Sequence, residues 1–162
     1  MREPLDETAL AELLPGEWVV SATNFPMWLS GERSNPRFGY EIISREPLVL
    51  SDDVTYVVTE SGQEKHILGT DTLRGDEFVW RGKGLLKLVA SHWSVAGASE
   101  DGTVAAIRFT KSAVSPAGID IIVRAGTQQP ELRALIAGST ELFGLTPEDF
   151  ASLTWLRRSL TS

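Results

Sequence analysis

The feature that most limits the possible folds is a long run of strand-like segments between Trp18 and Arg124. Each segment is rich in β-branched and aromatic residues or alternates apolar with polar side chains, which is the two-residue period of a β-strand. The segments are Trp18–Thr23, Phe38–Ile43, Val54–Glu60, Lys65–Leu73, Glu77–Arg81, Leu86–Ala96, Thr103–Lys111 and Ile119–Arg124. The sequence therefore predicts a mainly β chain of about eight strands.

Turn-forming residues stand between these segments, at Ser61-Gly62, Arg74-Gly75-Asp76, Asp101-Gly102 and Pro116-Ala117-Gly118. Glycine supplies a positive φ and proline fixes φ, so the turns should join neighbouring antiparallel strands. Antiparallel strands in this number form either a sandwich or a closed barrel. Short connections and strands that are apolar on both faces favour an up-and-down barrel with a lined cavity and a partly covered outer face.

Helical patterns stand at the two ends of the chain. Leu5–Leu14 carries a leucine stripe and ends at Pro15-Gly16, which predicts a short N-terminal helix. Pro130–Ala137 also has helical spacing, and Thr146, followed by a proline and two acids, is an N-cap that leads into a predicted helix over Phe150–Leu160. No repeat or linker divides the chain, so we expect one domain over residues 1–162.

Composition excludes several classes of function. The chain of 162 residues has no cysteine, which excludes thiolate chemistry and disulfides and fits a reducing, cytoplasmic location. The net charge of -7 disfavours binding to nucleic acid. No apolar run reaches membrane-spanning length, so we expect no membrane partner. His66 and His92 lack paired metal-ligand spacing and no phosphate loop is present, so neither metal nor cofactor is expected.

A short motif opens the first strand. Gly16-Glu17-Trp18 resembles the Gly-x-Trp signature of the lipocalin-like, or calycin, barrels. In that family the tryptophan is packed by a basic residue near the end of the barrel, and Arg124 and Arg108 are similar in placement to it. The resemblance implies an up-and-down barrel in which Trp18 and Arg124 plug the floor. The other interpretation of Trp18 is ordinary core packing, with its indole N–H bonded in either case.

A loop of about a dozen residues joins the first two predicted strands, which is long for a meander. It contains Phe25, Met27, Trp28 and Leu29, whose exposure to water would be costly. We interpret the loop as a lid over the barrel mouth, with Phe25, Met27 and Trp28 contacting a ligand. The alternative is that these side chains simply fill a hole in the core.

The candidate binding wall consists of aromatic residues on the strands, namely Tyr40, Tyr56, Phe78 and Trp80. His92 with Arg108 is the candidate polar anchor, because adjacent strands would bring an imidazole and a guanidinium together and arginine binds carboxylates through a planar fork of donors. The alternative for His92 is a partly exposed position on the outer face. A one-residue slip in strand register would reverse each assignment. These residues predict binding of a small, mainly apolar or amphipathic molecule.

Two other functions remain open from the sequence. Glu41, Asp71 and Asp120, together with His92, could supply acid and base catalysis if they converged in an apolar cavity. No motif for a catalytic nucleophile supports this enzyme hypothesis. Apolar residues of the tail could instead pair two copies in a homodimer, or dock the tail on its own barrel: Leu142, Phe143, Leu145, Phe150, Trp155 and Leu156.

Overall fold

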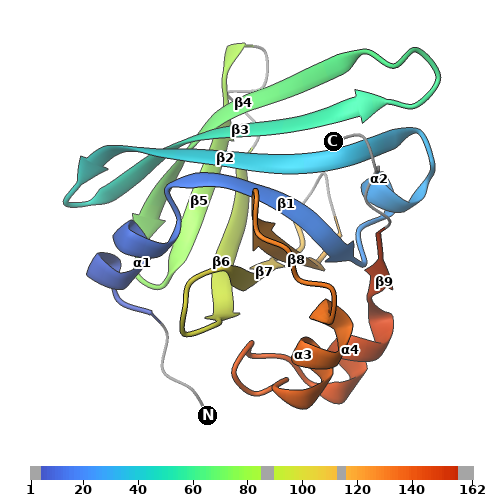
Figure 1. Cartoon of the computed structure of the whole chain (residues 1–162). Helices are drawn as coiled ribbons and strands as arrows, with labels where there is room; N and C mark the ends of the chain where they lie inside the picture. The colour runs from blue at the N-terminus through green and yellow to red at the C-terminus, as the bar shows by residue number, and fades with distance from the viewer. Residues whose placement is uncertain (1–4, 85–89, 113–115, 157–162) are drawn as a thin grey trace.

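The computed structural model describes residues 5–84, 90–112 and 116–156. Within these ranges the chain forms eight long strands and one short one (Figure 1). Their bounds are β1 Gly16–Thr23, β2 Arg33–Arg45, β3 Leu48–Val58, β4 Glu64–Arg74, β5 Glu77–Gly82, β6 Ala90–Ala98, β7 Val104–Phe109, β8 Gly118–Arg124 and β9 Thr154–Trp155.

The eight long strands form a closed barrel. Consecutive strands from β2 to β8 pair antiparallel with one another, and β1 pairs with both β8 and β2. The double pairing of β1 closes the ring, while β9 adds to the outer part of β1 through Ala22 and Thr23. The prediction of an antiparallel up-and-down barrel with short terminal helices is confirmed.

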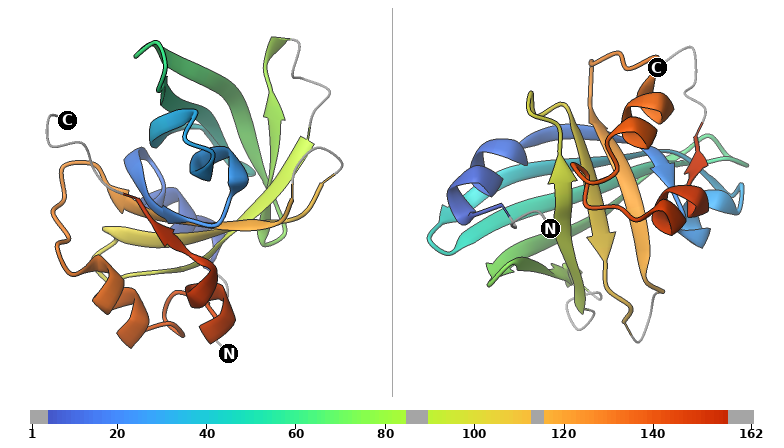
Figure 2. Two further views of the ribbon diagram at one scale, coloured as in Figure 1. Left: turned by 90° about the vertical axis from the view of Figure 1, so that its right-hand side faces the viewer. Right: turned by 90° about the horizontal axis from the view of Figure 1, so that it is seen from below.

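Two helices flank the ends of the barrel strands. Helix α1, Glu7–Leu13, lies at the end where β1 starts, and α2, Pro26–Leu29, follows the other end of β1 (Figure 1). Asp6 caps α1 by accepting a 2.8 Å hydrogen bond from the Ala9 amide. Seen from the α2 end, the strands surround α2, which lies across the opening (Figure 2, left).

The floor of the barrel is built around Trp18, which is fully buried. Its indole Nε1–H donates a 2.9 Å hydrogen bond to the carbonyl of Leu14, after α1. The guanidinium of Arg124, its direct partner in the β1–β8 ladder, lies 4.0 Å from the centroid of the indole ring. Arg124 also donates to the carbonyls of Leu13 and Pro15. One arginine therefore joins β8, β1 and the end of α1.

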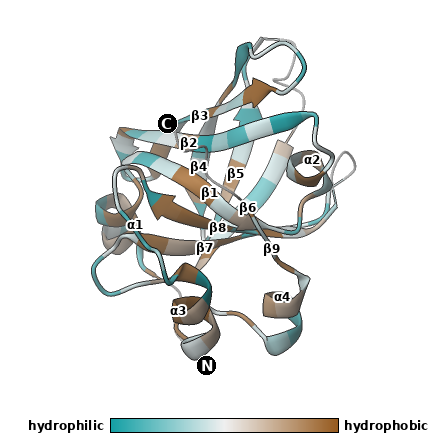
Figure 3. Ribbon diagram, turned by 45° about the vertical axis from the view of Figure 1, so that its right-hand side comes forward, coloured by the Kyte–Doolittle hydropathy of each residue, from teal (hydrophilic) through white to brown (hydrophobic). Residues whose placement is uncertain are grey.

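The C-terminal elements cover the outer face of the barrel beside β7 and β8. Helices α3, Leu132–Gly138, and α4, Pro147–Ser152, lie outside the strands (Figures 1 and 2). They form a second hydrophobic core with outward side chains of the strands, including Ile121 and Val123. This explains why β8 is buried on both faces and, apart from Asp120 and Arg124, consists of glycine and apolar residues (Figure 3). A Cβ at Gly97 would lie 2.2 Å from the Leu142 carbonyl, so only glycine fits there.

The tail differs from the sequence prediction in one respect. The predicted helix over Phe150–Leu160 is wrong in its described part, because α4 ends at Ser152 and the chain continues as β9. The Leu156 amide donates a 2.9 Å hydrogen bond to the Ser21 carbonyl on β1, which holds the segment extended. Residues 85–89 of the predicted sixth strand and residues 157–160 of the predicted helix lie outside the described residues.

The apolar tail residues contact their own barrel. Phe143 and Leu145 are buried in the outer core, and four more pack partly buried against the two cores: Leu142, Phe150, Trp155 and Leu156. Arg108 on β7 donates a 2.9 Å hydrogen bond to Asp149 of α4, which adds a polar link. The tail therefore buries these apolar side chains against its own barrel. The homodimer stays a prediction. Among the described residues, no helix has the length and apolarity needed to cross a membrane.

We expect the substitution Arg124→Ala to lower the free energy of unfolding by about 2–4 kcal/mol, because two carbonyls lose their donor and Trp18 loses its cation–π contact. Urea denaturation measures this change. Arg37→Ala is the matched control, since the Arg37 side chain is 38% exposed and lies 3.9 Å from Glu17 in a surface ion pair. That variant should change stability by at most about 0.5 kcal/mol. Equal effects of the two substitutions would contradict the proposed joint at the floor.

Candidate functional site

A cavity of about 210 Å³ lies inside the barrel, beneath α2. The wall of the cavity is formed by α2 with the preceding Phe25 and by the inner faces of strands β2 to β8. Most of the side chains in this wall are apolar or aromatic. The thirteen lining residues are Phe25, Met27, Trp28, Phe38, Tyr40, Asp52, Val54, Ile67, Trp80, Ser91, Trp93, Phe109 and Asp120.

The segment around α2 is fixed over the cavity by packing at both of its sides. Trp28 is 6% exposed and its ring meets Tyr56 edge to face, with 5.9 Å between centroids. Phe25 meets Phe109 in the same way at 5.0 Å. A Cβ at Gly118 would lie 2.5 Å from the Phe25 ring, so this glycine makes room for the ring. The predicted lid residues therefore line the cavity and also fill space in the core.

Trp93 is the centre of an aromatic stack in the barrel. Its ring lies between Tyr40, with centroids 5.6 Å apart, and Phe78, with centroids 4.5 Å apart, and both pairs are stacked. The indole Nε1–H of Trp93 donates a 2.9 Å hydrogen bond to Oδ1 of Asp71. Since Asp71 is fully buried, this bond satisfies only one of its two oxygens.

Three aspartates point into the interior, which is unusual for a barrel that is otherwise apolar. Asp52 on β3, Asp71 on β4 and Asp120 on β8 are 6%, 0% and 1% exposed. When all three are ionised, one side-chain oxygen of each has no hydrogen-bond donor among the described residues. Burying such groups without partners is costly, particularly when they are ionised.

Burial raises the pKa of all three carboxyls. The pKa of Asp120 rises to about 7 because it is desolvated, although hydrogen bonds from Thr23 and Trp28 oppose the shift. Asp52 and Asp71 are neighbours, and a proton on Asp52 allows a hydrogen bond to Asp71. Burial, followed by the repulsion of its neighbour, raises the pKa of Asp52. The pKa of Tyr40 is also raised well above its usual value. Burial is the main cause, and the three nearby carboxylates add to it.

The predicted wall residues fall into two groups. Tyr40 and Trp80 line the cavity, as do the lid residues. Phe78 and Tyr56 do not line the cavity. Phe78 stacks on Trp93. Tyr56 packs against Trp28, and the guanidinium of Arg33 lies 5.2 Å from the centroid of the Tyr56 ring. These two residues support the rings that form the wall.

The predicted anchor of His92 and Arg108 is wrong, because both side chains lie on the outer face. Trp93 points inward, so its neighbour His92 points outward, where it bonds Glu77 at 2.9 Å. Arg108 also points outward, and it donates to the Gly144 carbonyl and to Asp149. In the β6–β7 ladder Arg108 faces Ser94.

The four residues of the enzyme hypothesis do not converge, because they lie on different faces of the barrel wall. Asp71 and Asp120 are inside the barrel, whereas Glu41 is exposed and His92 lies outside. No group of three potential metal ligands occurs among the residues that the structure describes.

Sequence reasoning missed Asp52, Trp93, Phe38 and Phe109 as lining residues. Asp52 had a usable signal, because Leu48, Leu50, Asp52 and Val54 alternate along β3 and the first two are fully buried. That alternation places Asp52 on the inner face if β3 begins at Leu48, rather than at Val54 as predicted.

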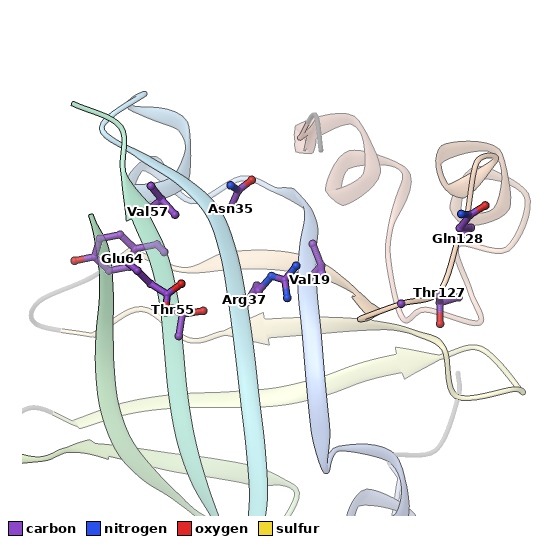
Figure 4. A pocket seen from close by; sticks show the side chains of 10 residues that line it. Val19, Asn35, Arg37, Thr55, Val57, Glu64, Thr127 and Gln128 are labelled. Atoms are coloured by element: carbon purple, nitrogen blue, oxygen red, sulfur yellow. The ribbon is translucent and has the colours of Figure 1, made fainter. Parts of the chain in front are cut away.

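A second hollow, of about 400 Å³, lies on the outside of the barrel (Figure 4). Its wall includes Arg37 from β2, Thr55 and Val57 from β3, and Glu64 from β4. These residues alternate with inward ones such as Phe38, so the hollow is separated from the internal cavity by the sheet itself.

The barrel is lipocalin-like in fold, as the Gly-x-Trp resemblance implied. Apocrustacyanin A1 of lobster is similar with a TM-score of 0.63 and 9% identity over 91% of this chain and 78% of that one. H1 crustacyanin from the lobster Homarus americanus is similar at 0.63 and 10%, over 97% and 87%. The siderocalin Ex-FABP is similar at 0.59 and 13%, over 90% and 94%. No protein-family model and no curated protein sequence matches the chain.

The buried carboxyls predict that the protein is less stable at pH 8 than at pH 5. The pKa values of these carboxyls in the folded state lie above the unfolded value of about 4. Between about pH 4 and pH 7 the folded state therefore binds more protons than the unfolded state, and stability falls as the pH rises through this range. We expect a loss of roughly 2–4 kcal/mol in urea denaturation.

The substitution Asp120→Asn should flatten this pH dependence, because it removes the group whose pKa is raised to about 7. Asp76→Asn is the matched control, because Asp76 lies exposed in the turn between β4 and β5, away from the barrel interior. A slope that is unchanged in Asp120→Asn would contradict the assignment.

Proposed function

We propose that the protein binds a small, mainly apolar molecule in the cavity beneath α2. The observation that carries this proposal is the cavity itself, which has aromatic walls and few polar groups inside a closed barrel. Binding sites for small molecules are usually concave, apolar and largely preformed, with a few polar groups that set orientation.

The size of the cavity limits the ligand. A volume of about 210 Å³ equals that of roughly seven waters, since a water occupies about 30 Å³ in the liquid. Pockets for drug-sized ligands are usually larger, at about 300–1,000 Å³. The ligand should therefore be of the size of a single substituted aromatic ring. Flat rings suit the stacked wall of Trp93 and its neighbours.

Similar barrels add weaker support. The siderocalin Ex-FABP functions through dual ligand specificities, so a barrel of this shape serves ligand binding in that protein. The absence of cysteine, which suits a reducing compartment, supports an intracellular site of action.

Filling the cavity should abolish binding of neutral aromatic probes with a single ring, such as phenethyl alcohol, benzyl alcohol and p-cresol. We expect the wild-type chain to bind at least one of them with a Kd on the order of 0.1–1 mM, measured by titration calorimetry. The substitution Val54→Phe places a ring in the cavity and should remove that binding.

Val57→Phe is the matched control, because Val57 lies three residues along the same strand and lines the outer hollow instead. This variant should bind as the wild type does. Absence of binding by all three probes to the wild type, or equal binding by Val54→Phe, would contradict the proposed function.

A further inference from the structure

We propose that the ligand of the cavity carries a protonated amine, which binds the carboxylate of Asp120. This inference rests on the proposed function, and it adds the chemical class of the ligand. An apolar ring would fill the aromatic part of the cavity, and the ammonium group would lie at the aspartates.

Asp120 is placed as an anchor for such a group. It lines the cavity, it is 1% exposed, and no donor of the described residues reaches its Oδ1. Its remaining hydrogen bonds come from Thr23 at the end of β1 and from Trp28 of α2. The strand partners of Asp120 are Thr23 and Ile107, so its backbone is held in the sheet on both sides. A ligand that donates to Oδ1 would complete the bonding of a rigid carboxylate.

The charges around the cavity favour a cation over an anion. Asp52 also lines the cavity, and Asp71, to which a protonated Asp52 is hydrogen-bonded, lies close enough to influence both Asp52 and Tyr40. None of the thirteen described residues that line the cavity is basic. A carboxylate ligand would therefore be repelled, whereas an ammonium ion would pair with a charge in a medium of low dielectric constant.

The aromatic lining supports the same class of ligand. Seven of the thirteen lining residues are aromatic: Phe25, Trp28, Phe38, Tyr40, Trp80, Trp93 and Phe109. Aromatic faces attract cations through their quadrupole, and they do so more strongly when water is excluded. In an aromatic amine, the ring would contact the apolar wall and the ammonium group would bind the buried acid.

Binding of the cation should depend on pH. At neutral pH Asp120 is partly protonated, because burial raises its pKa to about 7, and only the ionised form attracts the ammonium group. Tyr40 lies close enough to Asp120 for that carboxylate to raise its pKa, Asp52 lines the same cavity, and Asp71 lies beside Asp52. None of these groups carries a positive charge. Affinity should therefore rise between pH 5.5 and pH 8, with release of a proton to the buffer.

The test compares three probes that share one apolar body: phenethylamine, phenethyl alcohol and phenylpropionate. Titration calorimetry on the full chain at pH 8 should show the amine binding about tenfold more tightly than the alcohol, with the phenylpropionate anion weakest. In Asp120→Asn the preference for the amine should disappear while the alcohol still binds. Asp53→Asn should keep the preference, because its carboxyl faces outward.

The outcomes distinguish failure of the amine class from failure of the proposed function. If the alcohol binds and the amine binds no better, the amine class is overturned and the apolar binder stands. An amine preference that survives in Asp120→Asn would show attraction to the acidic surface, and would overturn the anchor. If no probe binds the wild type, the proposed function and this inference both fall. Binding of the alcohol to Asp120→Asn also shows that the variant is folded.

Discussion

The structure depends on the double pairing of β1, which joins β8 on one side and β2 on the other. Closure brings side chains from distant parts of the chain to one interior, so that Asp52 of β3 and Asp120 of β8 line the same cavity. The start of β1 is held by the stack of Arg124 on Trp18, and by the bonds from Arg124 to the end of α1. A closed ring also has no free edges that could pair with other chains.

The interior acids oppose stability in the same barrel. A methyl or amide group at these positions would avoid the cost of burying a carboxyl. Strongly perturbed carboxyls in a cavity are more typical of sites that bind or react than of structural cores. The proposed amine would compensate for this cost by supplying the missing charge and donor at Asp120. On this view, the least favourable group of the core is the one that selects the ligand.

Two separate apolar cores explain why the strands near the end of the chain have no polar face. The inner core surrounds Trp18 and Trp93, and the outer core lies between β7, β8 and the C-terminal helices. Residues such as Ile121 and Ile122 are both fully buried because they point into different cores. By contrast, β2 and β3 have one face toward water and show more mixed hydropathy (Figure 3).

The sequence by itself determined the eight strands of the barrel, their meander order and an aromatic segment after the first strand. These follow from local signals: the two-residue period, the glycine turns and the apolar residues after Thr23. Only the tertiary structure decided which acids and bases share the cavity. His92 and Trp93 are neighbours that point to opposite faces, so a shift of one residue exchanges a histidine for an indole. Asp52 and Asp120 could be assigned to one interior only after the barrel had closed, because that contact depends on strand pairing across the whole ring.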